Sequence, residues 1–231
     1  MPKNNYNGRR GIDSEKQLHS ILRKKRYRVH FIGIGGVSMY SLALLSKNMG
    51  ADVSGSDSAH SARVRRLSDS GITVFSGHSA ENIGEAELVV YSHAISEVNP
   101  ELREAQRRGL ICVNRAEFMG ALMLSYRTKI GVSGSHGKST TTAMLEHIFT
   151  YAGADPTVLS GSELECGEPY REGSSSTLIY EACEYRDSFL SFSPSIAVAL
   201  NLELDHTDYF ENIASLTEYA PIFGLSLELS I

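Results

Sequence analysis

The chain has 231 residues, of which 42% are hydrophobic and 21% charged, and its formal net charge is -5. This length allows one large domain or two modest ones with a real core, and the composition is ordinary for a soluble globular protein. No apolar run is long enough to span a membrane, so no membrane insertion is expected, and the basic N-terminus lacks the apolar segment of a secretory signal. The three cysteines are irregularly spaced, which argues against a disulfide framework or a zinc site and predicts a reducing, cytoplasmic setting.

The positive charge is concentrated at the N-terminus. Residues 1–28 carry nine Lys or Arg and two Asp or Glu, whereas the remainder carries 13 and 25. The cluster at residues 23–28 could touch nucleic acid or an anionic surface. We favour a solvated leader with a short amphipathic helix that uses Leu18, Ile21 and Leu22. Because the rest of the chain is acidic, no nucleic-acid partner is expected.

Short strand patterns alternate with helical patterns along the first half of the chain. Strands are expected at residues 29–32, 53–57, 72–75, 88–91 and 111–113, and helices at residues 38–49, 61–70, 100–108 and 115–124. Gly50, Gly71 and Gly109 follow three of these helices, where a glycine commonly ends a helix. Strands separated by helices predict a parallel, doubly wound α/β sheet.

A second α/β unit is expected to begin near residue 127. A strand at residues 130–133 leads through a glycine-rich turn into a helix that ends before Gly153, and buried strands follow at residues 177–181 and 196–200. Between them, the Gly-, Ser- and Glu-rich residues 161–176 are expected to form a surface loop or a small hairpin. The predicted division is therefore a leader (1–28), a first α/β domain (29–126) and a second α/β domain (127–231).

The second unit is organised around a phosphate-binding loop. A strand, a tight turn from Gly134 to Gly137 and a helix opening on Lys138-Ser139 direct backbone N–H groups and the positive end of the helix dipole toward an anion. Lys138 can reach the outer phosphates, and the Ser139 hydroxyl can hold Mg²⁺. The strict P-loop pattern has glycine where Val132 stands, so an ordinary Gly-Ser turn before a helix is the alternative.

A second glycine-rich loop, Gly33-Ile-Gly-Gly-Val-Ser38, follows the first strand, and Asp57 lies about 20 positions later. This pattern resembles the dinucleotide fingerprint, in which the backbone approaches a pyrophosphate and the acidic residue binds a ribose. The third glycine of the fingerprint is replaced by Ser38, and Gly36 is additional. A nucleotide-type βαβ unit is still predicted, whereas NAD specificity is in doubt.

Polar residues follow the strands of the second unit. Glu181 ends one strand and Asp205-His206 follows another, and parallel sheets bind ligands at the carboxyl ends of their strands. These residues and the phosphate loop should therefore converge. Magnesium prefers oxygen ligands, which favours Ser139 and Glu181, whereas His206 is either a ligand or a structural residue.

Four further residues leave alternatives open. Glu184 and Asp187 contact a substrate or metal, or they are solvated residues at a helix N-terminus, where the dipole favours acidic side chains. His136 touches a substrate or fills the loop. His78 contacts a polar ligand or lies at the surface.

Taken together, these stretches resemble the Mur ligase family over residues 29–208. The stretches that carry the resemblance are His30-Phe-Ile-Gly-Ile-Gly-Gly-Val-Ser-Met39, Val53-Ser-Gly-Ser-Asp57, Gly77-His78, Tyr91-Ser-His-Ala-Ile95, Asn99-Pro-Glu101, Arg115-Ala-Glu117, Gly134-Ser-His-Gly-Lys-Ser-Thr-Thr-Thr142, Glu181-Ala-Cys-Glu-Tyr-Arg-Asp-Ser-Phe189 and Asn201-Leu-Glu-Leu-Asp-His206. His136 and the Glu-Ala-x-Glu block are most similar to the member that joins L-alanine to UDP-N-acetylmuramate. The family's loop begins at the glycine corresponding to Gly134, which accounts for Val132.

The resemblance implies an ATP-dependent ligase of bacterial wall synthesis. Its Rossmann-like N-terminal domain would hold a UDP-sugar, and its P-loop-type central domain would bind ATP and Mg²⁺. The substrate carboxylate would take the γ-phosphate to give an acyl phosphate, and the amine of L-alanine would then displace phosphate to form the amide.

The resemblance also implies roles for individual residues. The UDP-sugar site would comprise Gly33, Gly35, Gly36, Ser38, Asp57, His78 and Ser92, with His78 near the uracil. The ATP site would comprise Gly134, Ser135, His136, Gly137, Lys138, Ser139 and Thr140. The implied catalytic residues are Lys138, Glu181 and His206, and the implied metal ligands are Ser139, Glu181 and His206. Lys138 would stabilise charge on the transferring phosphoryl group.

The chain also departs from the family pattern. Ser139 replaces the usual Thr, Cys183 stands where an acidic residue is common, and family members are considerably longer, with a third domain that contributes to the amino-acid site. Residues 221–231 do not resemble the family. The second domain is therefore expected to be truncated, and uncovered strand edges are expected to favour self-association.

Three other functions remain open at this point. The chain could be a truncated, non-catalytic fragment that binds a UDP-sugar or a nucleotide. It could belong to a ligase that recycles a murein peptide onto the same sugar nucleotide. An NAD-dependent enzyme using residues 33–38 and Asp57 would leave the phosphate loop at Gly134 unexplained.

Overall fold

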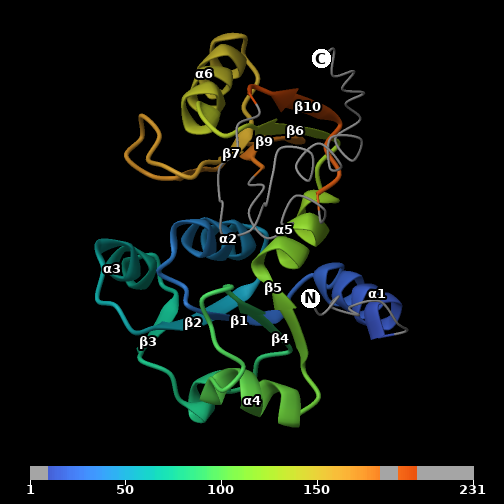
Figure 1. Ribbon diagram of the computed structural model, residues 1–231, viewed down its shortest axis with the longest axis vertical. Helices are drawn as coiled ribbons and strands as arrows, with labels where there is room; N and C mark the ends of the chain where they lie inside the picture. Colours follow the sequence, from blue (N-terminus) through green and yellow to red (C-terminus); the bar gives the residue numbers. More distant parts are fainter. Residues whose placement is uncertain (1–9, 183–191, 202–231) are drawn as a thin grey trace, which may run out of the picture. The chain divides into compact units, whose positions relative to one another are not determined.

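The structure is a computed structural model that describes residues 10–182 and 192–201. The chain divides into two compact units, Met1–Ala121 and Leu122–Ile231, each with its own sheet (Figure 1). The predicted boundary at 126/127 lies close to this division and stays a prediction. Within the described ranges, every helix is too short or too polar to cross a bilayer.

A five-stranded parallel sheet forms the centre of the first unit. In spatial order its strands are β3 (Thr73–Ser76), β2 (Asp52–Asp57), β1 (Arg28–Ile32), β4 (Leu88–Tyr91) and β5 (Ile111–Asn114). All neighbouring strands are parallel, which confirms the Rossmann-like expectation. The strand order reverses between β1 and β4, and such a reversal opens a ligand crevice at the carboxyl ends of the strands.

Helices cover both faces of this sheet (Figure 1). The helices α2 (Val37–Asn48) and α3 (Ala62–Asp69) lie on one face, and α4 (Pro100–Arg107) lies on the other with the 3₁₀ turn η1 (Ala80–Ile83). The amphipathic helix expected near the N-terminus is confirmed as α1 (Arg10–Leu22), which contacts β5 and buries Leu18 and Ile21. The helix α5 (Arg115–Met123) runs across the division between the two units.

The central strand β1 is buried on both faces, as is usual for a parallel sheet between helices. On one face, Phe31 packs edge-on against Phe118 of α5, with ring centroids 5.5 Å apart. On the other face, Ile32 joins an apolar cluster with side chains from η1, β4 and α4. His30 shares the face of Ile32 and is 0% exposed, so it is a polar residue inside this core.

The second unit has a mixed five-stranded sheet. Its spatial order is β10 (Ile196–Ala199), β6 (Thr128–Ser133), β9 (Thr177–Glu181), β7 (Thr157–Leu159) and β8 (Tyr170–Arg171). The pairs β10–β6, β6–β9 and β9–β7 are parallel, and β8 runs antiparallel to β7. The helix α6 (Lys138–Tyr151) follows β6 and packs against β6 and β9. This arrangement confirms the predicted strand, glycine loop and helix.

Two short elements were not expected from the sequence. The turn η1 and the strand β7 are too short to produce a periodic pattern of their own. The strand β7 is nevertheless fully buried, because Val158 packs in an apolar cluster with Ile130 and Ile179. The segment 161–176, expected to be a surface loop or a small hairpin, contributes one strand, β8, which pairs antiparallel with β7 outside the segment.

Candidate nucleotide-binding sites

The loop after β1 is a tight turn that requires glycine. Gly33 has φ +80, and a Cβ atom on Gly35 would lie 2.8 Å from Asp57 Oδ2. The N–H groups of Gly33 and Ile34 donate to the Ser56 carbonyl at 2.9 and 3.0 Å, which ties the loop to β2. The helix α2 then begins after Gly36, which offers no side-chain cap. Uncapped N–H groups at a helix start suit an anion such as a diphosphate.

Asp57 holds this loop in place. Its Oδ2 accepts from the Gly35 N–H at 2.8 Å, and its Oδ1 accepts from the Ala59 N–H at 2.8 Å. Arg63 donates through Nε to the Gly35 carbonyl at 2.9 Å, so both backbone groups of Gly35 are fixed. The sequence predicted contact between Asp57 and a ligand. The structure adds a bracing role, and the ligand contact stays a prediction.

The remaining residues predicted for the UDP-sugar site gather at the same end of the sheet. Ser38 lies in the first turn of α2, Ser92 directly follows β4, and His78 follows β3. The Ser92 hydroxyl lies close to Gly33, because a Cβ added to that glycine would be 3.1 Å from Ser92 Oγ. The first unit therefore brings its predicted site residues to the carboxyl ends of its strands.

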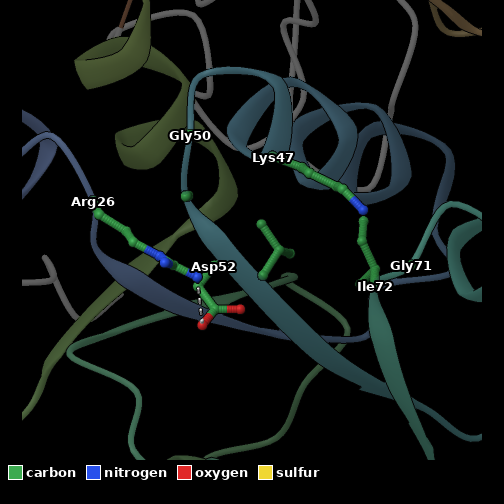
Figure 2. A pocket seen from close by; sticks show the side chains of 8 residues that line it. Arg26, Lys47, Gly50, Asp52, Gly71 and Ile72 are labelled. Atoms are coloured by element: carbon green, nitrogen blue, oxygen red, sulfur yellow. Dashed lines mark ion pairs between the residues drawn. The ribbon is translucent and has the colours of Figure 1, made fainter.

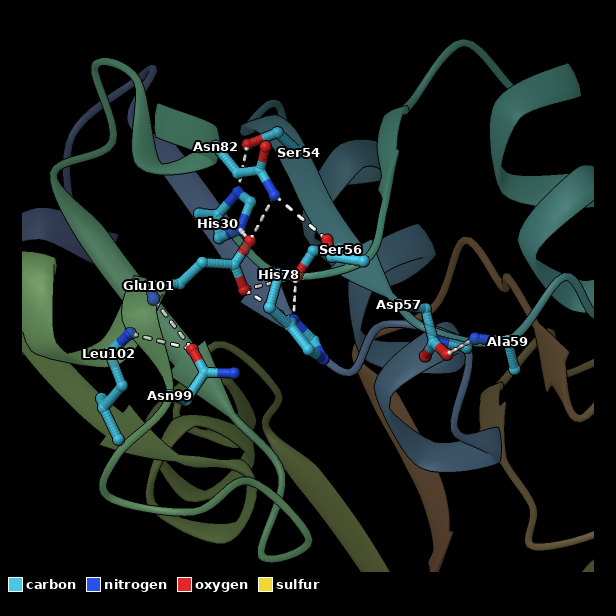
Figure 3. A network of polar contacts seen from close by, with 12 residues as sticks. His30, Ser54, Ser56, Asp57, Ala59, His78, Asn82, Asn99, Glu101 and Leu102 are labelled. Carbon is cyan, nitrogen blue, oxygen red and sulfur yellow. Dashed lines mark hydrogen bonds and ion pairs between the residues drawn. The ribbon is translucent and has the colours of Figure 1, made fainter. Parts of the chain in front are cut away.

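His78 is attached to a buried polar network centred on Glu101, the second residue of α4 (Figure 3). Glu101 is 0% exposed. Its Oε2 accepts from Ser56 Oγ at 2.6 Å and lies 2.9 Å from His78 Nδ1, and its Oε1 accepts from Asn82 Nδ2 at 2.7 Å. Nε2 of His30 lies 3.5 Å from the same Oε1. Four segments of the first unit thus place polar side chains around the Glu101 carboxylate.

The network keeps Glu101 ionised. Burial is the largest influence and would raise its pKa, but the polar contacts with His30, Ser56, Asn82 and His78 together lower the pKa to about 2. A buried carboxylate is stable only when such partners compensate its lost hydration. The sequence analysis did not identify Glu101 or Ser56 as functional, because burial of a glutamate at a helix start leaves no pattern in the sequence.

The amino ends of β2 and β3 carry a pocket of about 430 Å³ (Figure 2). Its polar lining includes Arg26, Lys47 and Asp52. Arg26 pairs with Asp52 at 3.9 Å, and Lys47 Nζ donates to the Ser70 carbonyl. This pocket lies at the opposite end of the strands from the glycine loop, so we assign it no part in the nucleotide site.

In the second unit, the turn between β6 and α6 also depends on glycine. Gly134 and Gly137 have φ +139 and +85, in the region that L side chains rarely adopt, and Gly137 is the N-cap of α6. Lys138 Nζ donates to the Gly134 carbonyl at 2.5 Å and lies 3.4 Å from the Ser135 carbonyl. The ammonium group therefore lies at the loop, where it can meet a phosphate.

Asn201 holds this loop through a pair of reciprocal hydrogen bonds that the sequence analysis missed. Its Oδ1 accepts from the His136 N–H at 2.9 Å, and its Nδ2 donates to the His136 carbonyl at 3.0 Å. Asn201 lies just beyond β10, the strand next to β6. In the sequence it follows a buried strand and begins the stretch 201–206, but neither feature predicts a contact with His136.

Glu181 ends β9, next to β6, and pairs in register with Val132. Its Oε1 accepts from Ser160 Oγ at 2.8 Å and from the Gly161 N–H at 2.7 Å, so the two residues that follow β7 orient the carboxylate. Ser139 begins the first turn of α6 with Lys138. A hydroxyl and an oriented carboxylate beside a phosphate loop are oxygen donors of the kind that Mg²⁺ prefers.

Two of the three predicted metal ligands, Ser139 and Glu181, lie within the described residues. No group of three or more His, Cys, Asp or Glu that could hold a metal ion occurs among residues 10–182 and 192–201. His206, the third predicted metal ligand, lies outside the described residues, as do Cys183, Glu184, Asp187 and Asp205. The predicted roles of His206, Glu184 and Asp187 therefore stay predictions.

Two family models match the chain in tandem. The model for the Mur ligase family, catalytic domain, matches residues 28–127, and the model for the Mur ligase middle domain matches residues 132–221. The two matches follow the order of the two sheets along the chain.

Individual relatives agree with these matches. A UDP-N-acetylmuramate–L-alanine ligase of Clostridium botulinum is 46% identical over 199 residues, which are 86% of this chain and 43% of the relative. The crystal structure of a UDP-N-acetylmuramate-alanine ligase from Thermotoga maritima superposes with a TM-score of 0.78 at 32% identity, covering 86% of this chain and 46% of that one. The UDP-N-acetylmuramate:L-alanyl-gamma-D-glutamyl-meso-diaminopimelate ligase from Neisseria meningitides has a TM-score of 0.78 at 28% identity, covering 86% and 67%. The chain thus spans less than half the length of the curated relative.

Proposed function

Because this chain belongs to the Mur ligase family, we propose that it carries the sugar-nucleotide-binding and ATP-binding parts of a ligase that joins L-alanine to UDP-N-acetylmuramate in peptidoglycan synthesis. One observation carries this proposal. Each unit has a glycine loop between a buried strand and a helix, at the carboxyl end of a parallel strand pair. Two separate phosphate-binding loops fit an enzyme that uses a nucleotide sugar and ATP together.

In the first unit, the diphosphate of UDP-N-acetylmuramate would lie against the loop of residues 33–38. The N–H groups at the start of α2 would donate to it, while Asp57 keeps Gly35 in place. Ser92 and His78 would flank the ligand on either side of the loop. The broken dinucleotide fingerprint at Ser38 supports a ligand other than NAD.

In the second unit, ATP would lie against residues 134–140, with Lys138 at its outer phosphates. The donor set of Ser139 and Glu181 fits Mg²⁺, Glu181 with His206 would border a second ion, and the metal when bound would neutralise phosphate charge. Asn201 would keep the loop in its binding conformation through His136.

The proposed reaction has two steps. The carboxylate of UDP-N-acetylmuramate attacks the γ-phosphorus of ATP, which forms an acyl phosphate and releases ADP. The amine of L-alanine then attacks the acyl carbon, and phosphate leaves as the amide forms. Lys138 would stabilise the charge on the transferred phosphoryl group in the first step.

A second ligase reaction is supported by one specific observation. The Neisseria structure, whose title names a ligase of a murein tripeptide, has the same TM-score as the Thermotoga structure. A ligase that recycles a murein peptide onto the same sugar nucleotide would use the same two loops. Comparison of L-alanine with the tripeptide in an amide-forming assay of the whole ligase would separate the two activities.

We also propose a cytoplasmic location, where the nucleotide substrates are available.

We further propose that the chain self-associates through the second unit. The support is an exposed apolar face on α6, where Met144, Ile148 and Tyr151 are 58%, 58% and 97% exposed at helical spacing. Sedimentation velocity of the chain should show a concentration-dependent dimer. A Met144→Ser/Ile148→Ser variant that associates as strongly as the wild type would contradict this surface.

The proposed binding functions are tested by calorimetric titration of the chain with UDP-N-acetylmuramate, then Mg-ATP, with NAD as the control. Saturable binding of the first two ligands without heat from NAD is expected. If the folded chain binds neither, its motifs do not form working sites. If it binds both but does not hydrolyse or transfer phosphate with L-alanine present, it acts as a binding fragment only.

A further inference from the structure

The carboxylate of Glu101 is surrounded by polar groups from four segments of the first unit. An ionised carboxylate carries no proton and can only accept hydrogen bonds. Its four partners come from β1 (His30), β2 (Ser56), the segment after β3 (His78) and η1 (Asn82). The side chain of His78 reaches the surface and is 20% exposed, whereas Glu101 and His30 are 0% exposed.

The contacts of His78 fix the position of its proton. Nδ1 lies 2.9 Å from Glu101 Oε2, so it must donate to this carboxylate. Nδ1 also lies 3.0 Å from Ser56 Oγ, whose single hydrogen already points to Glu101 at 2.6 Å. The Ser56 oxygen can therefore only accept from His78. Both contacts require the proton to be on Nδ1.

We propose that Glu101 is a positioning residue that holds a proton of His78 on Nδ1, which leaves Nε2 as the hydrogen-bond acceptor of the uncharged ring toward the ligand. Nε2 lies on the opposite edge of the ring from the buried network (Figure 3). The inference rests on the proposed function, because that function puts a uridine nucleotide beside His78.

A hydrogen-bond acceptor at Nε2 of His78 can bond only to a part of the ligand that offers a donor. Phosphate oxygens are themselves acceptors, so a ring whose only proton is on Nδ1 has no donor left for the diphosphate. A uridine nucleotide offers two kinds of donor, the base N3–H and the ribose hydroxyls. Ser56 places the ring near the glycine loop, since its carbonyl bonds Gly33 and Ile34 while its side chain contacts His78. The Nε2 atom would thus accept a hydrogen bond from a donor on the nucleoside part of the ligand.

The tautomer itself can be measured in the unaltered protein. Long-range ¹H–¹⁵N correlation spectra of the ¹⁵N-labelled chain distinguish a protonated ring nitrogen from an unprotonated one, and loss of one signal in His78→Asn assigns His78 among the eight histidines. We expect a protonated Nδ1 and an unprotonated Nε2 at neutral pH. A protonated Nε2, with Nδ1 either protonated or not, would overturn the inference without any variant of Glu101.

The role of Glu101 is tested by Glu101→Gln with Ser54→Ala as the matched control. A carboxamide can donate to Nδ1, which releases the proton to Nε2 and turns the outer edge of His78 into a donor. In the spectra of this variant, we expect the protonated nitrogen of His78 to be Nε2 and the unprotonated nitrogen to be Nδ1. We expect the affinity for UDP, measured by calorimetry, to fall by up to about tenfold, the value of one hydrogen bond. Ser54, on β2 like Ser56, lies 2.9 Å from His30 Nδ1, and Ser54→Ala should change neither quantity.

Ligand analogues identify the donor. If the base is read, N3-methyl-UDP should bind the wild type about as weakly as UDP binds Glu101→Gln, and 2′-deoxy-UDP should bind normally. The reverse pattern assigns the contact to the ribose. Failure of wild-type protein to bind UDP at all would contradict the proposed function. Normal UDP binding with an unchanged tautomer in folded Glu101→Gln would contradict only the role of Glu101.

Discussion

At the scale of single residues, Glu101 couples the stability of the first unit to pH. Its folded-state pKa is about 2, below its ordinary value of 4.5, because its hydrogen bonds outweigh the effect of burial. A lowered pKa stabilises the fold fully above pH 4.5, and this contribution is lost as the pH falls through 2. We expect this group to account for a loss of roughly 3 kcal/mol of unfolding free energy between those pH values.

Glu101→Gln provides the comparison for this prediction, because the carboxamide does not titrate while the other carboxylates are unchanged. Urea unfolding of both proteins at several pH values between neutral and strongly acid should show a steeper decline for the wild type. The variant should be less stable at neutral pH, where the wild-type network is complete. Parallel curves for the two proteins would mean that Glu101 titrates as an ordinary carboxylate in the folded state.

Sequence reasoning identified the residues whose role depends on local chain geometry, and it missed those whose role depends on burial. Gly33, Gly35 and Lys138 were found from strand, turn and helix patterns. The tight turn requires glycine, and a phosphate-binding loop is typically followed by a cation such as Lys138. Glu101 and Asn201 were missed as functional residues, because each acts through contacts that are distant in the sequence. Asn201 and His136, for example, are 65 positions apart.

At the scale of elements, the same distinction holds. Strands and helices with several apolar positions were predicted within a few residues, and β4 and β9 were predicted at their observed bounds. The three-residue strand β7 was missed, because it becomes a strand only through its pairing with β9 and β8. This omission mattered for the site, since Ser160, just after β7, orients Glu181.

The connection between β10 and the phosphate loop leads to a prediction at this scale. Asn201→Ala removes both hydrogen bonds to the His136 backbone, which frees the loop to leave its binding conformation. Two hydrogen bonds of ordinary strength predict that Mg-ATP affinity falls about tenfold, as measured by calorimetric titration. Binding of UDP-N-acetylmuramate should be unchanged.

Ser195→Ala is the matched control, because it also removes two contacts from β10 but at the other end of the strand. Ser195 Oγ accepts from the Lys129 N–H at 3.2 Å and lies 3.4 Å from the Arg127 carbonyl. This variant should cost similar stability and leave Mg-ATP affinity within about twofold of the wild type. Equal losses of ATP affinity in both variants would indicate general damage to the sheet.

At the scale of the whole molecule, the two units have separate sheets, separate cores and separate glycine loops. This organisation was predictable, because the change from one strand series to the next falls between two glycine-rich motifs about a hundred residues apart. The exact boundary was less accessible, since α5 continues across the division between Ala121 and Leu122. A helix that spans a boundary shows no change of pattern at that point.

Separate units predict separable ligand binding, and Lys138 is the residue that tests this. Lys138→Ala removes the ammonium group from the phosphate loop, and the loss of a charge-assisted contact predicts Mg-ATP binding that is about 100-fold weaker. UDP-N-acetylmuramate should bind within about twofold of the wild type, because its proposed site lies on the other sheet. Lys129→Ala removes the same charge from the opposite end of β6 and should spare both ligands. Weakened sugar-nucleotide binding in Lys138→Ala alone would mean that the two sites are energetically coupled.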